Sequence, residues 1–272
     1  MNHEPRVPRD DVNVTARHPL KDGAVMLAGV VVVAGLIFGV AVLLVEQLVP
    51  YVPPSWEARL FPDFGLMEHT PDSPEQEAQL EVLNTLLERL EAHWPERPET
   101  LRVGLLDTDG VNALAFPGGL ILVTTGLMTE VQSENELAFV IGHELGHYHG
   151  RDHLRSLGRG VALATILALL GQSGTVGELV GISSDLSTRG FSREQEEQAD
   201  AFGLGLVESE FGHVHGATDF FDRLPAPESA IERALATYLA THPLNDERVR
   251  SIEQLARDRD WKTEGETTAL AR

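Results

Sequence analysis

An uncharged apolar stretch near the amino terminus constrains this chain more than any other feature of its sequence. Residues 24–45 carry no charged side chain and are mostly aliphatic. A helix over this stretch is about 33 Å long at 1.5 Å per residue, which is enough to cross a bilayer. A cleaved signal peptide is the rival interpretation, but its apolar region is normally about 7–15 residues long and ends at a small-residue cleavage site. We therefore expect one uncleaved transmembrane anchor over residues 24–45.

The charges that flank this stretch predict its orientation. The basic residues are Arg6, Arg9, Arg17 and Lys21 before it and Arg59 after it, within the first twenty residues. Because basic flanks remain in the cytoplasm, residues 1–23 are predicted to form a cytoplasmic tail. The remainder is then expected outside a bacterial inner membrane, in the periplasm.

Two glycines of the predicted anchor permit close packing of a second helix. Gly35 and Gly39 form a G-x-x-x-G pair, a spacing that lets two membrane helices approach each other closely. Glycine is also frequent in membrane helices that do not pair. A monomer and a homo-oligomer therefore both remain open.

The residues after the anchor divide into a linker, one domain and a tail. Residues 46–72 are rich in proline and contain aromatic side chains, which suits a stiff juxtamembrane linker. Ser73 followed by Pro74 then predicts the start of a helix. We expect a single domain over residues 73–260 and a polar tail over residues 261–272.

A small sheet is predicted in the first half of this domain. Three short apolar runs, separated by turn-forming residues, cover residues 101–106, 111–116 and 120–124. Helical periodicity dominates elsewhere. The expected fold class is α+β and mainly helical, with a small antiparallel sheet.

The sequence His143-Glu144-Leu145-Gly146-His147 gives the strongest indication of chemistry. Two imidazoles four residues apart lie on one face of a helix and can bind one metal ion, while the glutamate beside them handles protons. Ser133 and Glu136 match a capping box at the start of this helix. The apolar residues 137–141 predict that the helix is buried. A pair of hydrogen-bonded structural histidines is the alternative.

A third ligand is expected on a helix that begins after Ser192. Ser192 and Gln195 again match a capping box, and Glu196 and Asp200 share a face of the helix that follows. Two histidines and one glutamate form a standard zinc ligand set that leaves a fourth position for water. A solvated acidic helix is the alternative, which we accept for the neighbouring glutamates but not for Glu196. Asp200 is expected behind the ligands, where its carboxylate can orient an imidazole.

Four segments together resemble family forty-eight of the metallopeptidases, the membrane-bound zinc peptidases that include the HtpX, CAAX prenyl and OMA-type proteases. They are residues 112–119 with 124–127, 143–147, 192–200 and 241–243. The resemblance covers roughly residues 75–255 and implies a zincin-like, gluzincin fold. By position it makes His143, His147 and Glu196 the ligands of one zinc ion per chain. Glu144 becomes the catalytic base.

The same resemblance places His242 near the metal, after a predicted helix over residues 230–240. An imidazole in the open zinc position would silence the enzyme, whereas one a few ångströms away could donate to the oxyanion. A loop histidine with neither role is the third reading. The resemblance also indicates residues 112–116 as the strand that an extended substrate pairs with, although a purely structural hairpin is equally consistent with the sequence.

The chain departs from this family in its membrane segments, because it has one convincing span where other members have several. The uncharged residues 160–177 are marginal for a second span. The family often has membrane-embedded sequence here, so a membrane-dipping segment, a core helix and a cover over the site all remain open.

Composition excludes several classes of partner and ligand. A net charge of -21 argues against nucleic acid, and the absence of cysteine leaves histidine and carboxylate as the metal ligands. No metal role is expected for four other histidines of the predicted domain, which are His149, His153, His213 and His215.

The sequence therefore predicts a single-pass, membrane-anchored, zinc-dependent metalloendopeptidase that acts on proteins or peptides in envelope quality control. Its substrate role rests on resemblance alone. A non-catalytic envelope chaperone or adaptor that keeps the zinc-binding fold is the alternative from another class. The intact Glu144 and a complete ligand set argue against that alternative. A zinc hydrolase acting on a non-peptide substrate would have the same ligands.

Overall fold

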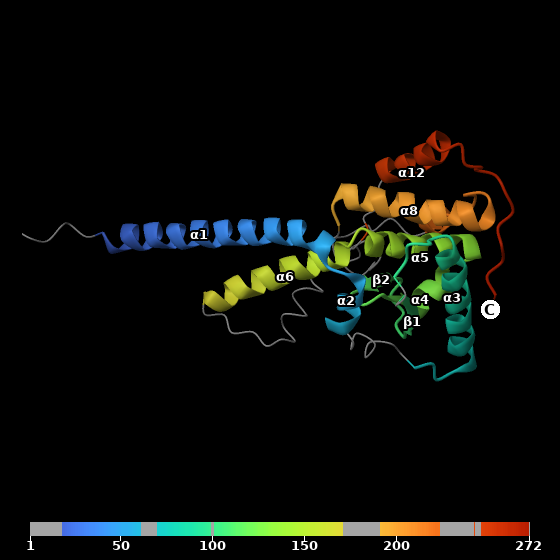
Figure 1. The fold of residues 1–272 in the computed structure, drawn as a ribbon, viewed down its shortest axis with the longest axis horizontal. Coiled ribbons are helices and arrows are strands. Elements are labelled where there is room, and N and C mark those ends of the chain that lie inside the picture. The colour runs from blue at the N-terminus through green and yellow to red at the C-terminus, as the bar shows by residue number, and fades with distance from the viewer. Residues whose placement is uncertain are drawn as a thin grey trace, which may run out of the picture.

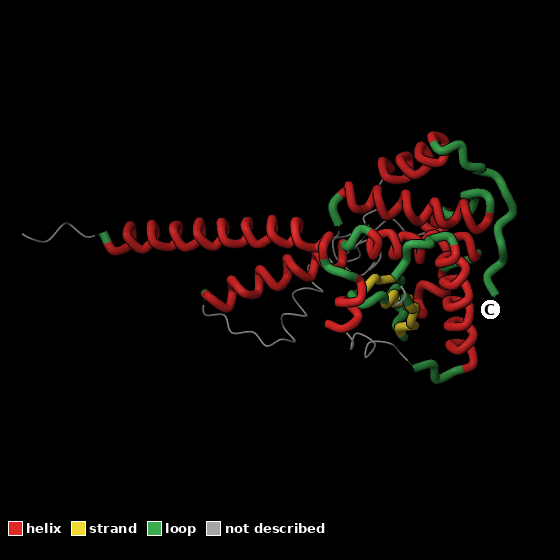
Figure 2. Tube along the Cα trace, in the orientation of Figure 1, coloured by secondary structure: helices red, strands yellow, loops and turns green. Residues whose placement is uncertain are grey.

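Helices dominate the chain, and one of them projects alone from the rest. The computed structural model describes residues 18–60, 70–98, 101–170, 191–223, 242 and 246–271. A long amino-terminal helix extends from a helical body (Figure 1), and the strands are confined to the middle of that body (Figure 2). The prediction of a mainly helical chain with a small sheet is confirmed.

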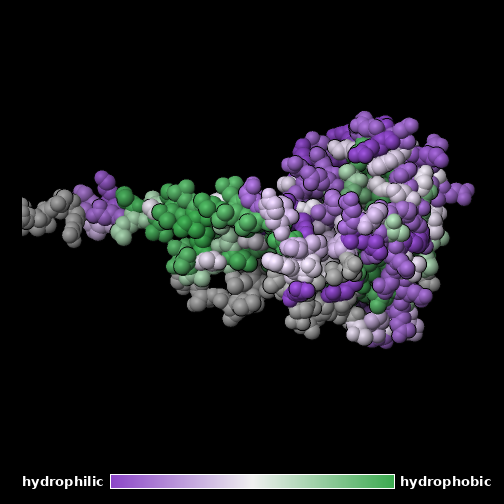
Figure 3. All heavy atoms as spheres, in the orientation of Figure 1, coloured by the Kyte–Doolittle hydropathy of each residue, from purple (hydrophilic) through white to green (hydrophobic). Residues whose placement is uncertain are grey.

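The projecting helix is α1, which spans Pro19–Leu48 and buries none of its residues. It is the one helix in the described part of the chain that is long and apolar enough to cross a membrane. Its apolar side chains form the green band in Figure 3. The chain then continues through a 3-10 turn, Val49–Tyr51, into the short helix α2, Pro54–Leu60.

The body begins with helix α3, Pro74–Ala92, at the predicted start. The Ser73 hydroxyl accepts a hydrogen bond from the Gln76 backbone N–H at 3.2 Å, which satisfies one of the free donors of the first turn. The leucines spaced at helical intervals face the core, as their periodicity predicts. Those that are buried are Leu83, Leu86, Leu87 and Leu90.

The sheet is mixed, so the prediction of an antiparallel sheet is wrong. Its strands are β1 (Arg102–Leu106), β2 (Ala113–Phe116) and β3 (Leu120–Thr124), in the spatial order β1-β3-β2. β2 and β3 form a tight antiparallel hairpin through Gly118 and Gly119, whose φ angles of 86° and 84° suit glycine. Strand β3 lies between the other two strands, and it pairs with β1 in parallel.

The short helix α4, Thr125–Glu130, is followed in the chain by α5, Glu134–His149, which is the buried central helix of the body. The Ser133 hydroxyl caps α5 through the Glu136 N–H, and the run from residue 135 to residue 148 is entirely buried. The Glu136 carboxylate does not complete the predicted capping box. It accepts the Gln132 N–H at 2.8 Å and pairs with Arg223 at 2.6 Å instead.

Helix α8, Arg193–Phe211, packs directly on α5 and starts at the predicted capping box of Ser192 and Gln195. Glycine makes the approach possible. A Cβ added to Gly146 would lie 2.7 Å from the Ala199 Cα, closer than real Cβ atoms come to another atom. The two helices that carry the predicted metal ligands therefore touch through their backbones.

The carboxyl-terminal residues cover this helix pair. The short helix α9, Asp219–Arg223, is followed by α12, Asp246–Asp258, which lies on α8 (Figure 1). The polar tail then returns to the start of α5, where the Glu134 N–H donates to the Thr268 carbonyl at 2.9 Å. The predicted helix over residues 230–240 lies outside the described residues.

Helix α6, Asp152–Leu169, leaves the body and runs beside α1 (Figure 1). The contact is tight at Gly158, where an added Cβ would lie 2.7 Å from a methyl group of Val45. Further along, both helices line an apolar groove. Residues 160–169 are thus helical, while residues 171–190 lie outside the described residues, so the three readings of residues 160–177 stay open.

Candidate metal centre

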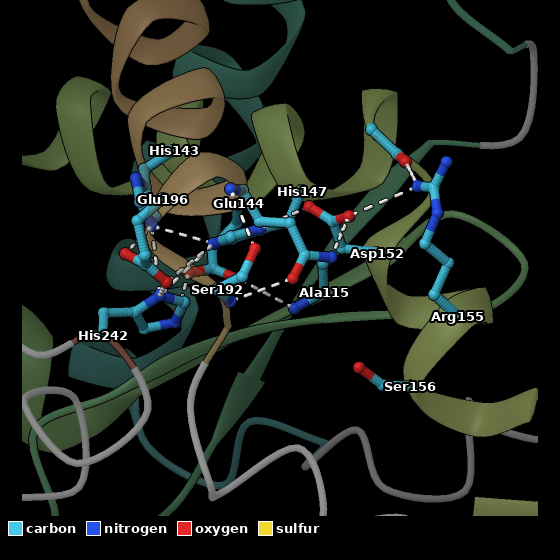
Figure 4. A network of polar contacts seen from close by, with 12 residues as sticks. Ala115, His143, Glu144, His147, Asp152, Arg155, Ser156, Ser192, Glu196 and His242 are labelled. Carbon is cyan, nitrogen blue, oxygen red and sulfur yellow. Dashed lines mark hydrogen bonds and ion pairs between the residues drawn. The ribbon is translucent and has the colours of Figure 1, made fainter. Parts of the chain in front are cut away.

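Four buried side chains converge, two from α5, one from α8 and one from residue 242, which precedes α12 in the chain. They are His143, His147, Glu196 and His242, and one nitrogen or oxygen atom of each lies within 4.8 Å of all the others. Figure 4 shows the rings and the carboxylate pointing at a common centre. The structure therefore brings together all three predicted ligands and the histidine that the sequence places near them.

The spacing of these atoms fits a metal ion. The Nε2 atoms of His143 and His147 are 3.0 Å apart, and His242 Nδ1 lies 3.1 Å and 3.3 Å from them. The same His242 nitrogen lies 3.1 Å from Glu196 Oε1. Ligand atoms at about 2.1 Å around a tetrahedral zinc ion would be roughly 3.4 Å apart. The four atoms are close to that geometry.

Two carboxylates hold the first two imidazoles in the orientation that a metal requires. Asp200 lies 2.9 Å from His143 Nδ1, and Asp152 lies 2.9 Å from His147 Nδ1. An ionised carboxylate only accepts hydrogen bonds, so each Nδ1–H donates to it and each Nε2 presents its lone pair inward. Two lone pairs facing each other at 3.0 Å need a proton or a metal cation between them.

The charges in the cluster also favour a cation. Burial opposes ionisation of Glu196, but hydrogen bonds from His147 and His242 outweigh it and hold the pKa of Glu196 far below its usual range. Burial and the neighbouring imidazoles keep the pKa of His143 well below its usual value. Burial also opposes charge on His147, yet hydrogen bonds to Asp152 and Glu196 raise its pKa to about 9. A metal ion that binds here would therefore displace a proton from His147.

Glu144 lies between this cluster and the sheet. Its Oε2 accepts the Ala115 backbone N–H of β2 at 3.0 Å, and its Oε1 lies 3.3 Å from His242 Nε2. Burial raises the pKa of Glu144. The carboxyl group thus sits beside the ligands without belonging to them, which is where a general base would be needed.

Three further residues contact the predicted ligands, and the sequence did not predict them. Arg248 of α12 pairs with Asp200 at 2.7 Å and with Glu196 at 2.5 Å. The Phe191 ring stacks on His147 at 3.9 Å between centroids. Of the three, Asp152 alone could have been predicted from its place in the sequence, because an acidic residue just after a metal-binding helix can bond to a histidine of that helix.

The four histidines expected to have no metal role lie outside the cluster. His149 packs between the rings of Trp94 and Phe202. His153 is buried against the carboxylate of Glu57, at 2.9 Å.

Comparison with known proteins agrees with this geometry. The sequence profile described as Peptidase family M48 matches residues 74–256. Mitochondrial metalloendopeptidase OMA1 of Arabidopsis thaliana is 35% identical over 145 residues, which cover 53% of this chain and 29% of that protein. The putative beta-barrel assembly-enhancing protease of Vibrio cholerae is 29% identical over 189 residues, covering 65% and 39%. Metalloprotease LoiP of Escherichia coli is 32% identical over 150 residues, covering 52% and 57%.

This chain matches less than two thirds of the length of each of these relatives. The likeness falls on the domain that carries the metal cluster, and the profile match covers more than half of the chain. Members of this peptidase family are metal-dependent, and the converging side chains of α5 and α8 belong to a group that could hold a metal ion. The chain therefore belongs to peptidase family M48.

Proposed function

We propose that this protein is a membrane-anchored, zinc-dependent metalloendopeptidase. The observation that carries the proposal is the position of Glu144, a buried carboxyl group held between four side chains that could bind a metal ion and strand β2 of the sheet. A purely structural metal site has no use for an extra acid at that place. The same position argues against a non-catalytic chaperone or adaptor.

Zinc suits the ligands better than a hard cation does, because imidazole nitrogens predominate among them. Zinc bound to His143, His147 and Glu196 would lower the pKa of a water molecule and polarise the scissile carbonyl. We assign one zinc ion to each chain. Asp200 and Asp152 keep the ligand imidazoles in the correct tautomer.

Glu144 takes the proton of the attacking water. Burial raises the pKa of Glu144, which makes it a stronger base than an exposed carboxylate, and the proton that it accepts can then pass to the leaving amine. The Ala115 N–H fixes one of its oxygens, so the other oxygen stays directed toward the site. The reaction therefore needs no covalent intermediate with the protein.

The substrate backbone is held by β2. Among the strands that the structure describes, β2 lies at an edge of the sheet, and its Ala115 N–H donates to Glu144. An extended peptide along that edge would place its scissile bond over the metal and gain backbone hydrogen bonds that do not depend on sequence. Proteins and peptides, rather than nucleic acids, are the substrates that this arrangement suits.

We place the catalytic domain in the periplasm, anchored by α1 in the inner membrane, with a role in envelope protein quality control. Three observations support this placement: the length of α1, the basic residues that precede it, and the similarity to a putative beta-barrel assembly-enhancing protease. Two anchors could pair through Gly35 and Gly39, where nothing in the described residues lies within 4 Å of an added Cβ.

Reporter fusions test the orientation. Alkaline phosphatase fused after Arg272 should be active, because basic residues on the amino-terminal side keep that end in the cytoplasm. The matched control is the same enzyme fused after Lys21, which should be inactive. A fluorescent protein that folds only in the cytoplasm and glows after Arg272 would reverse the topology.

Substitution of Glu144 tests the mechanism. Glu144→Gln should retain the metal and the fold but lose peptidase activity on casein by a hundredfold or more, on the order expected for loss of a general base. The control is Glu88→Gln, which makes the same change on an exposed position of α3 and should cleave at the wild-type rate. Wild-type turnover in Glu144→Gln would disprove the mechanism.

His242 is close enough to the other three side chains to fill the fourth position around a metal ion, which the catalytic water would otherwise take. Its Nδ1 lies 3.1–3.3 Å from an atom of each of the other three ligands, so it completes a tetrahedral set. We propose that His242 gates the site and must withdraw before water can bind.

Removal of this imidazole should therefore open the site. His242→Ala is expected to raise basal casein cleavage and self-cleavage, whereas His215→Ala, on an exposed histidine outside the cluster, should change neither. A fall of roughly 10²-fold with zinc retained would make His242 an oxyanion donor instead. Unchanged cleavage would leave it with neither role.

A further inference from the structure

The turn between α5 and α6 contacts both the metal centre and the segment that follows the membrane anchor. We use the name α5–α6 turn for residues 150–155, which are the two residues between the helices and the first turn of α6. On one side it holds Asp152, which is 4% exposed. On the other side it holds arginines that reach α1 and α2. Figure 4 shows Asp152 and Arg155 extending the polar network away from the ligands.

Both carboxylate oxygens of Asp152 accept hydrogen bonds. Its Oδ2 accepts from His147 Nδ1 at 2.9 Å. Its Oδ1 accepts from the Gln195 amide and from Arg155 Nη1, at 3.3 Å for the arginine. A carboxylate bound on both oxygens keeps one orientation, and it thereby fixes the ring to which it is bonded.

Glu57 connects the same turn to α2. Its side chain is completely buried, although α2 belongs to the segment between anchor and domain. It pairs with Arg151 and with His153 Nε2, the latter at 2.9 Å. Arg151 also donates to the Val52 carbonyl at 2.7 Å. The backbone of Arg151 is in a left-handed conformation, with φ at 60°, which non-glycine residues rarely adopt.

Glu46 connects the turn to the end of the membrane helix. It lies 2.8 Å from Arg155 Nε and 3.2 Å from Arg159 Nη1. Arg155 in turn bonds the Gly150 carbonyl and Asp152. A continuous path of charged contacts therefore runs from α1 through Arg155 and Asp152 to His147.

A linker that only connects the anchor to the domain would not need the ion pairs of Glu46 and Glu57. A proline-rich linker spans the distance between anchor and domain without docking, whereas burying the Glu57 carboxylate is costly unless its partners are held in place. Buried ion pairs stabilise a fold weakly but specify one arrangement of its parts. The arrangement specified here is that of the turn which carries Asp152.

We propose that Asp152 is a positioning residue for His147, and that the juxtamembrane residues Glu46 and Glu57 hold it there by docking on the α5–α6 turn. The inference rests on the proposed metal site. It makes the affinity of that site depend on the segment next to the membrane. A chain whose juxtamembrane segment is pulled from the turn then binds its metal more weakly.

Zinc affinity of the full-length protein in detergent tests this coupling. The variants are Asp152→Asn, Glu57→Gln and their combination, with Glu88→Gln as the control of equal charge change. Competition with a chromophoric chelator gives the affinity, and thermal unfolding of the metal-free form gives the stability. Loss of an outer carboxylate typically weakens metal binding by about 10–100-fold. We expect a loss in this range for Asp152→Asn, a loss for Glu57→Gln and no change for Glu88→Gln.

The double variant separates positioning from general destabilisation. If Glu57 acts through Asp152, the combined change should weaken zinc binding no more than Asp152→Asn alone, because the effect of Glu57 then reaches the metal site only through Asp152. Independent effects would multiply instead and overturn the coupling. Wild-type zinc affinity in Asp152→Asn would overturn the positioning role itself.

Two further results keep the test decisive. Should Glu57→Gln fail to fold, Glu46→Gln replaces it, because the Glu46 side chain is 36% exposed and its loss buries no unpaired charge. That variant should weaken zinc binding in the same direction, and wild-type affinity in it would contradict the coupling. A wild-type chain that binds zinc but cleaves no casein would contradict the proposed peptidase function. It would not contradict the coupling between the juxtamembrane residues and the metal site.

Discussion

The close contact of α5 and α8 is the constraint on which the rest of the site depends. His143 and His147 lie on α5 and Glu196 lies on α8. If the two helices were a few ångströms further apart, these three predicted ligands could not contact one metal ion. Glycine permits the contact at two places: an added Cβ on Gly203 would lie 2.7 Å from the His143 backbone nitrogen, and one on Gly146 would meet Ala199. Larger side chains would force the helices apart, because packed interiors cannot absorb such overlaps.

Buried charge is the second determinant, and arginines lie beside each of the buried carboxylates. Arg248 pairs with both Asp200 and Glu196, while Arg155 pairs with Asp152. Each of these carboxylates is therefore paired with an arginine, and a carboxylate fixed in this way can orient an imidazole or bind a cation. The centre is thus organised in layers, with ligands inside, carboxylates behind them and arginines outermost. Through Arg155 and Arg151, the outermost layer also meets the juxtamembrane segment.

Features set by short stretches of sequence could be predicted. The caps at Ser133 and Ser192, the buried helix α5 and the inward face of Glu196 all follow from spacing within one helix. Features set by packing between distant segments could not. The insertion of β3 between β1 and β2 depends on which way the chain crosses after β1. The pairing of Arg248 with Asp200 depends on how α12 lies on α8, and no pattern within α12 encodes that.

Metal analysis of the purified full-length chain tests the central claim most directly. The account predicts one equivalent of zinc per chain, with casein cleavage that a chelator abolishes and added zinc restores. Zinc should be lost from His143→Ala, which removes one of the converging ligands. A wild-type chain that binds no metal, or that cleaves casein equally well in the presence of chelator, would contradict the account.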